Sequence, residues 1–195
     1  MAHVLAVSGS PMEVSRSAVL LGHVCRLLTE RGHTVDRLAV RDLPAAALLH
    51  ADFSDPAVIG SIARLERADG LVVATPVYKA AYSGVIKVFL DLLPQDALRH
   101  KTVLPIATGG SPNHMLALDY ALRPVLQSLA ARHILPGVYA NDSQVTLLPE
   151  GAHHIGLEIS ERLDEAVATL FAEGLRPPAT AGFEPIAFSR VRCSV

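Results

Sequence analysis

The chain has 195 residues, a length typical of a single domain with a sizeable core. Its formal net charge of −2 excludes the strongly basic surface of a nucleic-acid-binding protein, and no apolar run reaches the ~18 residues of a membrane span. Two cysteines are too few for a disulfide framework and the first residues lack the features of a signal peptide, so we expect a cytoplasmic protein without nucleic-acid or membrane partners.

Short apolar stretches predict five strands, over residues 3–8, 34–40, 69–74, 102–108 and 134–140. The second stretch alternates apolar and polar side chains, which is typical of an edge strand. The first and third are continuous apolar runs, as expected for strands buried on both faces. Because helical patterns separate the five stretches, the sequence predicts an α/β fold with a doubly wound, five-stranded parallel sheet and helices on both faces.

The helical patterns have clear starts and apolar faces. Asp55 and Pro56 mark one start, with proline at the first helical position. The first helix has an apolar face of Leu20, Val24, Leu27 and Leu28, and the last helix has one of Ile159, Leu163, Val167 and Leu170. Prolines and small residues dominate after Gly174. We therefore expect one domain over residues 1–174 and an irregular C-terminal tail over residues 175–195.

The segment SGVIKVFLDLLP (83–94) predicts a helix of a different kind. Ser83 can cap its start, and between Val85 and Leu93 only Lys87 and Asp91 are polar. A helix that is apolar nearly all round must be covered on more than one side. It is either the central helix of a large core or part of a subunit interface. In a chain this small we favour the interface.

The loop after the first strand is rich in hydroxyl groups. It leads into a helix N-terminus, where exposed N–H groups and the helix dipole favour an anion. The donors expected there are Gly9, Ser10, Ser15, Arg16 and Ser17. The loop matches neither the dinucleotide fingerprint nor the P-loop, so we favour a terminal monophosphate as its ligand. The alternative is an ordinary serine-capped helix.

Two further loops follow the third and fourth strands. In TPVYKAAYSG (75–84), Pro76 stiffens the chain, Val77 and Tyr78 could face a flat heterocycle, and Lys79 could stabilise negative charge near it. The alternative is a turn whose tyrosines cover the core. In TGGSPNH (108–114), Gly109 and Gly110 allow close approach of a ligand, although most glycine pairs only form turns. We interpret His114 as a surface or capping residue.

Together the three loops have the layout of a flavodoxin-like FMN site. The sequence resembles the NAD(P)H-dependent FMN reductases of the flavodoxin-like superfamily, in particular their alkanesulfonate-utilisation branch. The resemblance covers residues 3–145, and it is carried by GSPMEVSRS, ADGLVVATPVYKAAYSGVIKVFLDLLP, VLPIATGGSPNHMLALDYALRPVL and ILPGVYANDSQV. It implies the strand order 2-1-3-4-5, with an FMN-binding domain over residues 1–174.

The resemblance also implies the roles of particular residues. The FMN phosphate would be held by Ser8, Ser10, Ser15, Arg16 and Ser17. The ribityl chain and the isoalloxazine would be flanked by Pro76, Val77, Tyr78 and Lys79, with Thr108, Gly109 and Gly110 along the other edge. The family commonly forms homo-oligomers, either dimers or dimers of dimers, with the helices after the third and fourth strands in contact.

The segment NHMLALDYALRPVLQSLAA (113–131) has helical periodicity although it contains Pro124. Proline removes an N–H group and clashes with the carbonyl four residues earlier, which belongs to Tyr120. A kink or a π-bulge at Tyr120 would relieve the clash. The resemblance implies a tyrosine-marked π-helix beside the flavin, associated with use of flavin as a releasable substrate. The alternative is a kinked helix with a tyrosine packed at an interface.

The implied activity is reduction of FMN to FMNH₂ by hydride transfer from NADPH or NADH. The product would supply an FMNH₂-dependent monooxygenase that desulfonates organosulfonates. Because the cofactors carry the chemistry, we expect no catalytic side chain and no metal site. The nearest alternative is an FMN-containing NAD(P)H quinone or azo reductase. A flavodoxin-type electron carrier is disfavoured because such carriers are strongly acidic and stack aromatic residues on the flavin, whereas this chain is nearly neutral and has no tryptophan.

Overall fold

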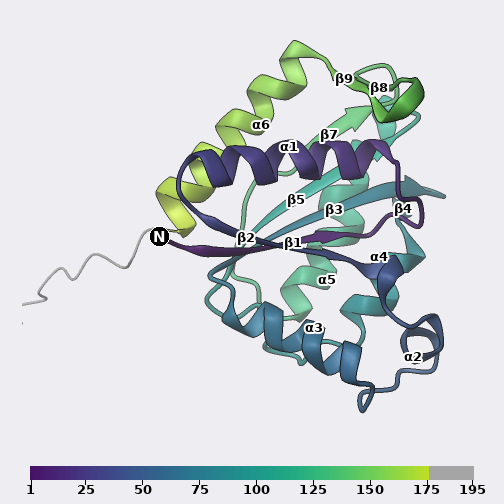
Figure 1. Ribbon diagram of the computed structural model, residues 1–195, viewed down its shortest axis with the longest axis vertical. Coiled ribbons are helices and arrows are strands. Elements are labelled where there is room, and N and C mark those ends of the chain that lie inside the picture. The colour runs from purple at the N-terminus through teal and green to yellow at the C-terminus, as the bar shows by residue number, and fades with distance from the viewer. Residues whose placement is uncertain (176–195) are drawn as a thin grey trace, which may run out of the picture.

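A computed structural model describes residues 1–175, and the expected tail lies outside these residues except for Leu175. The main sheet has a parallel path β2-β1-β3-β5-β6, flanked by β4 on β3 and β7 on β5 (Figure 1). Its strands are β1 (His3–Ser8), β2 (Thr34–Ala39), β3 (Gly70–Tyr78), β4 (Ala81–Tyr82), β5 (Thr102–Gly109), β6 (His133–Ile134) and β7 (Val138–Asn141). A separate antiparallel pair consists of β8 (Val145–Leu147) and β9 (His153–Ile155).

The α/β fold class and the order of the strands are as predicted. The expected edge strand is β2, at one end of the parallel path. The expected fifth strand is divided into β6 and β7, which both pair in parallel with β5. Pro136 lies between them and lacks the N–H group that a continuous strand would donate, which accounts for the interruption.

Helices cover both faces of the sheet (Figure 1). On one face lie α1 (Arg16–Glu30) and α6 (Leu157–Thr169), and on the other lie α3 (Pro56–Arg67), α4 (Gly84–Leu90), α5 (Arg123–Ser128) and the short α2 (Ala45–Leu49). Single turns of 3₁₀ helix are η1 (Val40–Asp42), η2 (Pro112–Met115) and η4 (Pro149–Gly151), and π-helices are η3 (Ala117–Leu122) and η5 (Leu170–Gly174). Among the described residues, no helix combines the length and the apolar character needed to pass through a lipid bilayer.

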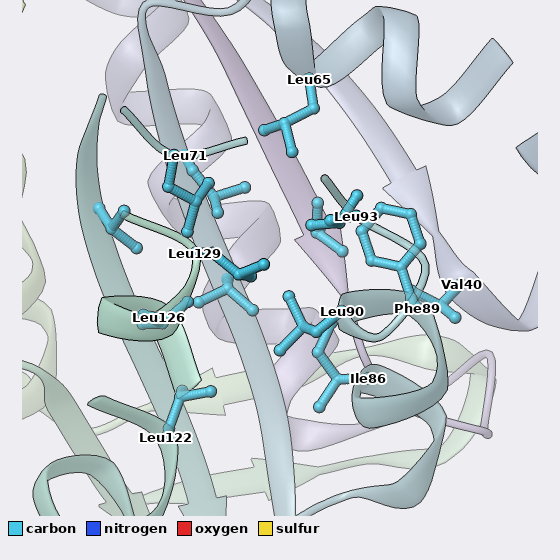
Figure 2. Close-up of a cluster of buried hydrophobic side chains, with 14 of the residues drawn as sticks. Val40, Leu65, Leu71, Ile86, Phe89, Leu90, Leu93, Leu122, Leu126 and Leu129 are labelled. Carbon is cyan, nitrogen blue, oxygen red and sulfur yellow. The ribbon is translucent and has the colours of Figure 1, made fainter. Parts of the chain in front are cut away.

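Two hydrophobic cores result, one on each face of the sheet. In β1, Leu5 and Val7 belong to the core beneath α3 and α4, while Val4 and Ala6 belong to the core beneath α1 and α6. Figure 2 shows the first of these cores, which includes Phe89 of α4. The apolar faces predicted for the first and last helices are buried in the second core, although Leu170 of the last one lies in η5, just after α6.

The predicted helix starts are confirmed at α3 and α4. The Asp55 side chain accepts hydrogen bonds from Ala57 N and Val58 N, and Ser83 Oγ accepts one from Ile86 N. The α4 helix buries Ile86, Phe89 and Leu90 within this chain, and Val85 and Val88 are half-buried against the same core. The expected role of α4 in a subunit interface stays a prediction.

A bidentate ion pair fixes the edge strand β2 to α3. Arg64 donates to Asp36 from Nε at 2.8 Å and from Nη2 at 2.6 Å, and both side chains are partly exposed. The hydrogen bond from Arg64 holds the pKa of the Asp36 carboxyl below its usual value. The stabilisation is therefore complete above the unfolded-state pKa of about 3.9, and it is lost as the pH falls through the lower folded-state pKa.

We expect Asp36→Asn to lower the free energy of unfolding by about 1 kcal/mol at pH 7, because it removes the charge that Arg64 binds. The difference from the unsubstituted protein should shrink below about pH 4, where Asp36 of the unfolded chain begins to protonate while the folded state still holds it ionised. Urea unfolding at pH 7 and at about pH 3 measures both values. An equal difference at the two pH values would contradict this account.

Candidate functional site

The first loop joins the end of β1 to α1 and buries hydroxyl groups. Ser10 and Ser17 are fully buried and Ser8 is 7% exposed. Ser15 caps α1, because its Oγ accepts from Ala18 N at 3.2 Å. The Ser8 hydroxyl oxygen is buried and has no hydrogen-bond partner among the described residues. A buried hydroxyl without a partner is costly unless a ligand completes its hydrogen bonds.

The α1 N-terminus adds further donors beside these hydroxyls. The first N–H groups of any α-helix lack an intrahelical acceptor, and in α1 only Ala18 N of this turn is taken up by the cap. The positive end of the helix dipole lies at the same place. A donor set of hydroxyls, backbone N–H groups and one guanidinium fits a phosphate monoester, and so it fits the phosphate of the expected FMN.

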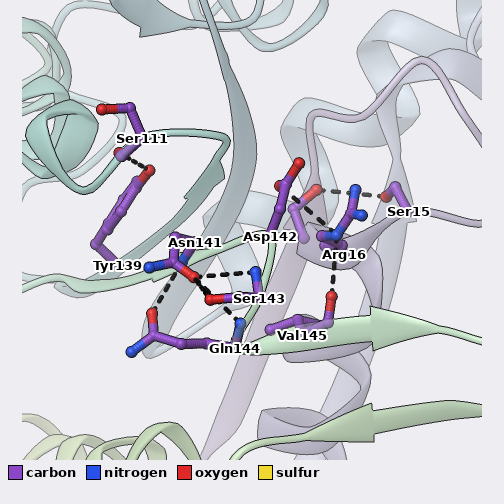
Figure 3. Close-up of polar contacts among 10 residues, drawn as sticks. Ser15, Arg16, Ser111, Tyr139, Asn141, Asp142, Ser143, Gln144 and Val145 are labelled. Carbon is purple, nitrogen blue, oxygen red and sulfur yellow. Dashed lines mark hydrogen bonds and ion pairs between the residues drawn. The ribbon is translucent and has the colours of Figure 1, made fainter.

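Arg16 turns towards the segment after β7 (Figure 3). Its Nε donates to Val145 O at 2.9 Å and lies 3.5 Å from Asp142 Oδ1. The Arg16 side chain is 36% exposed, so part of it faces solvent. The structure thus places Arg16 beside the serines predicted to act with it, and it adds a carboxylate to the same site.

The first loop is attached to β3 and to α4. Gly9 N donates to Ala74 O at 2.8 Å, and Ser83 Oγ donates to Gly9 O. Ser83 N in turn donates to Thr75 Oγ1 at 3.0 Å. Sequence reasoning identified Ser83 only as a helix cap, because nothing in the local pattern reveals a partner 74 residues away.

The second loop is mostly a β-hairpin. The expected third strand, 69–74, extends to Tyr78, so Pro76 lies within β3, opposite Thr108, and not after it. The strand continues because Val77 and Tyr78 pair with β4 in antiparallel register. The two turn residues, Lys79 and Ala80, have φ values of 50° and 65°, which fit a tight hairpin turn but are strained for residues with a Cβ.

The side chains of the hairpin point in different directions. Val77 is buried in the core below the third loop, and Tyr78 is half-exposed. Lys79 is exposed at the tip of the hairpin. Of the residues predicted to flank a ring, Tyr78 and Lys79 therefore offer side chains to solvent, and Val77 supports the loop from below.

The third loop lies against Val77 and is supported by Tyr139 of β7. A Cβ on Gly109 would lie 2.8 Å from Tyr139 Oη and 3.3 Å from Val77 Cβ, so only glycine fits this position. Tyr139 donates to Ser111 O at 2.5 Å, and burial raises the pKa of its phenol. His114 Nδ1 is buried near Gly109 and has no partner within the described residues.

The segment around Tyr120 forms the π-helix η3, which is one of the two solutions, a kink or a π-bulge, expected from Pro124 and the one that the resemblance implies. Arg123 N donates to Leu118 O, five residues earlier, so the backbone widens just before the proline. Tyr120 is 79% exposed, and η3 packs against β4 of the second loop. Leu116 and Met115 are also exposed beside it.

The parallel register brings the three predicted loops to one edge of the sheet. Ser8 is paired with Ala74 across β1 and β3, and Pro76 with Thr108 across β3 and β5. Sequence reasoning missed Tyr139, Asp142 and the bond between Ser83 and Gly9. The only available signal was the turn sequence after β7, where Asn141 Oδ1 accepts from Ser143 N at 3.0 Å and from Gln144 N at 3.1 Å.

Comparisons with known proteins find similar sequences and a similar solved structure. A family model described as NADPH-dependent FMN reductase matches residues 2–146. FMN reductase (NADPH) of Pseudomonas putida is 49% identical, over 90% of this chain and 89% of the relative, and FMN reductase (NADPH) of Escherichia coli is 46% identical, over 86% and 87%. The solved apo form of the NADH:FMN oxidoreductase EMOB is 38% identical, covers 92% of this chain and 94% of its own, and has a TM-score of 0.82.

Proposed function

The chain belongs to the NADPH-dependent FMN reductase family and is an enzyme that reduces FMN with NAD(P)H, and we propose that its three loops hold the flavin as a releasable substrate. Ser8, Ser10, Ser15, Arg16 and Ser17 bind the phosphate in this proposal. Pro76, Tyr78, Lys79 and the backbone of Val77, whose side chain is buried in the core, would flank the ribityl chain and the ring on one edge. Thr108, Gly109 and Gly110 would flank them on the other. The buried, unpaired Ser8 hydroxyl beside the α1 N-terminus is the observation that carries the proposal.

The protein positions the reactants, and FMN supplies the redox chemistry by accepting a hydride equivalent from NAD(P)H. Gly109 and Gly110 would let the backbone approach the flavin ring, because they carry no side chain. The Lys79 ammonium would stabilise negative charge near the ring. The names of two close relatives favour NADPH over NADH as the electron donor.

The direct test is oxidation of NADPH, followed at 340 nm, by protein stripped of flavin. We expect oxidation to depend strictly on added FMN and to give one FMNH₂ per NADPH under anaerobic conditions. A stable flavin semiquinone with little NADPH oxidation would instead identify an electron carrier. A kcat/KM for quinones or azo compounds well above that for FMN would identify a quinone or azo reductase.

The proposed role of Tyr120 gives a second test. We expect Tyr120→Ala to purify yellow, with FMN retained, and to lose turnover of free flavin, because the exposed tyrosine of η3 is proposed to permit flavin exchange at a subunit interface. Absorbance at about 450 nm after gel filtration measures retained flavin, and NADPH oxidation with added FMN measures turnover.

Loss of a side chain that is 79% exposed should leave the fold intact, which thermal unfolding checks. The matched control is Phe53→Ala, which removes another exposed aromatic side chain outside the π-helix and the three loops, and it should change neither retained flavin nor turnover. A colourless and fully active Tyr120→Ala variant would exclude this role.

We further place the enzyme in the alkanesulfonate-utilisation branch, as a homo-oligomer built from dimers or dimers of dimers. Leu116, Met115 and Tyr120 form an exposed apolar surface on and beside η3 that a second copy would cover. FMNH₂ reacts quickly with oxygen, so the proposed cytoplasmic partner is an FMNH₂-dependent monooxygenase that cleaves C–S bonds in organosulfonates. Light scattering tests the assembly, and sulfite release in a coupled assay tests the partner. A monomer, or no sulfite, would contradict these two proposals.

The domain assignment is part of the same proposal. Residues 1–174 would form one FMN-binding unit, since α6 and η5 complete the core on the α1 face of the sheet. Leu170 at the start of η5 is fully buried in that core. Limited proteolysis that yields a stable fragment ending near residue 174 would support this assignment, and cleavage within residues 1–174 would contradict it.

A further inference from the structure

Arg16 is the only cationic side chain among the loop residues assigned to the phosphate, and a carboxylate, that of Asp142, lies beside it. Asp142 Oδ1 is 3.5 Å from Arg16 Nε (Figure 3). Its other oxygen, Oδ2, lies 3.8 Å from the position that a Cβ on Gly110 would occupy. The Asp142 side chain therefore stands between the first loop, which is assigned to the phosphate, and the third loop, which is assigned to the ring.

The position of Asp142 is fixed by its own turn. Asn141 Oδ1 accepts from Ser143 N, Ser143 Oγ and Gln144 N at 2.7 to 3.1 Å, and Asn141 N donates to Gln144 Oε1 at 3.0 Å. These bonds constrain the four residues that carry Asp142. Arg16 Nε is also bound to Val145 O, just after the turn. The backbone that carries Asp142 and the Arg16 side chain are thus each fixed, and the half-exposed Asp142 carboxylate lies beside the guanidinium at ion-pair distance.

We propose that Asp142 competes with the FMN phosphate for Arg16 and so weakens flavin binding enough for the product to leave. This inference rests on the proposed function of the three loops. The phosphate is close to dianionic at neutral pH, and Asp142 acts against it in two ways. It neutralises the Arg16 charge, and it repels the phosphate directly. A flavin that is a substrate must dissociate at each turnover, so a weakened phosphate site serves turnover, whereas a prosthetic group would gain from a stronger one.

The test is the affinity of the full-length, flavin-free protein for FMN, measured by quenching of flavin fluorescence at about 20 mM salt. Asp142→Asn keeps the size of the side chain and removes its charge. We expect the Kd for FMN to fall about threefold to tenfold, as for charge pairs at partly exposed sites. The Kd for riboflavin, which has no phosphate, should stay unchanged. The gain for FMN should shrink at about 500 mM salt.

Two further variants separate competition from other effects. In an Arg16→Ala background, only direct repulsion is left, so Asp142→Asn should improve FMN binding by about twofold or less. The matched control is Glu30→Gln, which makes the same charge change on α1 in an exposed ion pair with Arg26. It should leave the Kd for FMN unchanged.

A role of Asp142 in positioning Arg16 gives the opposite result. Weaker FMN binding by Asp142→Asn would show that the carboxylate orients the guanidinium for the phosphate, and an unchanged Kd would show that the pair is incidental; both would overturn the inference. A tighter Kd for riboflavin as well would also overturn it, because the effect would not act through phosphate. Failure of the proposed function is separate, since the unsubstituted protein would then show no FMN-dependent NADPH oxidation.

Discussion

Gly9→Ala is expected to reduce kcat/KM for FMN by about 100-fold and to lower the free energy of unfolding by about 2 to 3 kcal/mol. A Cβ at this position would lie 2.6 Å from Ile86 Cβ and 3.4 Å from Ala74 O. Ile86 is fully buried on α4, and its Cβ is fixed to the helix backbone, so either α4 or the first loop must move. Steady-state NADPH oxidation with varied FMN and urea unfolding measure the two losses.

The atom responsible for the clash can be identified with a second substitution. Ile86→Ala removes Cγ1, which would lie 3.3 Å from the new Cβ, but keeps the Ile86 Cβ itself. The double variant Gly9→Ala/Ile86→Ala should therefore regain no FMN turnover. Gly60→Ala is the control. Gly60 is an exposed glycine of α3 with no atom within 4 Å of its Cβ position, so this substitution should raise the free energy of unfolding by about 0.5 to 1 kcal/mol. Turnover restored in the double variant would contradict the assignment to Cβ.

The sequence predicted those helices and strands whose burial produces a local pattern of apolar residues. Continuous apolar runs identified β1 and β3, a short apolar stretch with a proline identified β5, and alternation identified the edge strand β2, because the burial of each strand determines its local pattern of apolar residues. The apolar faces of α1 and α6 were predicted for the same reason. Pro124 located an irregularity at Tyr120, since a proline inside a helix removes a backbone donor, but it left a kink and a π-bulge open, and only the family resemblance indicated the π-helix.

Features that depend on contacts between distant residues could not be predicted in this way. The hairpin of β3 and β4 has Lys79 and Ala80 at its turn, and neither is a typical residue for positive φ. The bonds from Ser83 to Gly9 and from Tyr139 to Ser111 join residues 74 and 28 positions apart. Local propensity has no information about such pairs. The positions of the loops in the chain were therefore predictable, whereas the hydrogen bonds that hold the loops in place were not.

These supports give the three loops one connected frame. Ser83 links the first loop to the start of α4 and to Thr75 in β3, and Tyr139 supports the third loop from β7. A ligand that spans the loops therefore meets backbone whose spacing is already fixed. Preorganisation of this kind lowers the entropy lost when a ligand binds.

Gly109→Ala is expected to lower kcat/KM for FMN by about 10- to 100-fold, through the support that Tyr139 gives to the third loop. The new Cβ would lie 2.8 Å from Tyr139 Oη, so the tyrosine must withdraw and its hydrogen bond to Ser111 O must break. Tyr139→Phe alone should cost about 1 kcal/mol of stability, since it leaves Ser111 O without this donor. NADPH oxidation with varied FMN and thermal unfolding measure both variants.

The double variant Gly109→Ala/Tyr139→Phe then decides whether the hydroxyl is the obstacle. Without Oη the nearest atoms to the new Cβ are His114 Nδ1 at 3.2 Å and Val77 Cβ at 3.3 Å, contacts that a small shift relieves. We therefore expect the double variant to turn over FMN faster than Gly109→Ala alone, a strongly non-additive result. Gly110→Ala, whose Cβ would meet Asp142 Oδ2 at an ordinary 3.8 Å, should unfold at the same temperature as the unsubstituted protein. If the losses of FMN turnover in Gly109→Ala and Tyr139→Phe simply add in the double variant, the Tyr139 hydroxyl is not the obstacle to a Cβ at position 109.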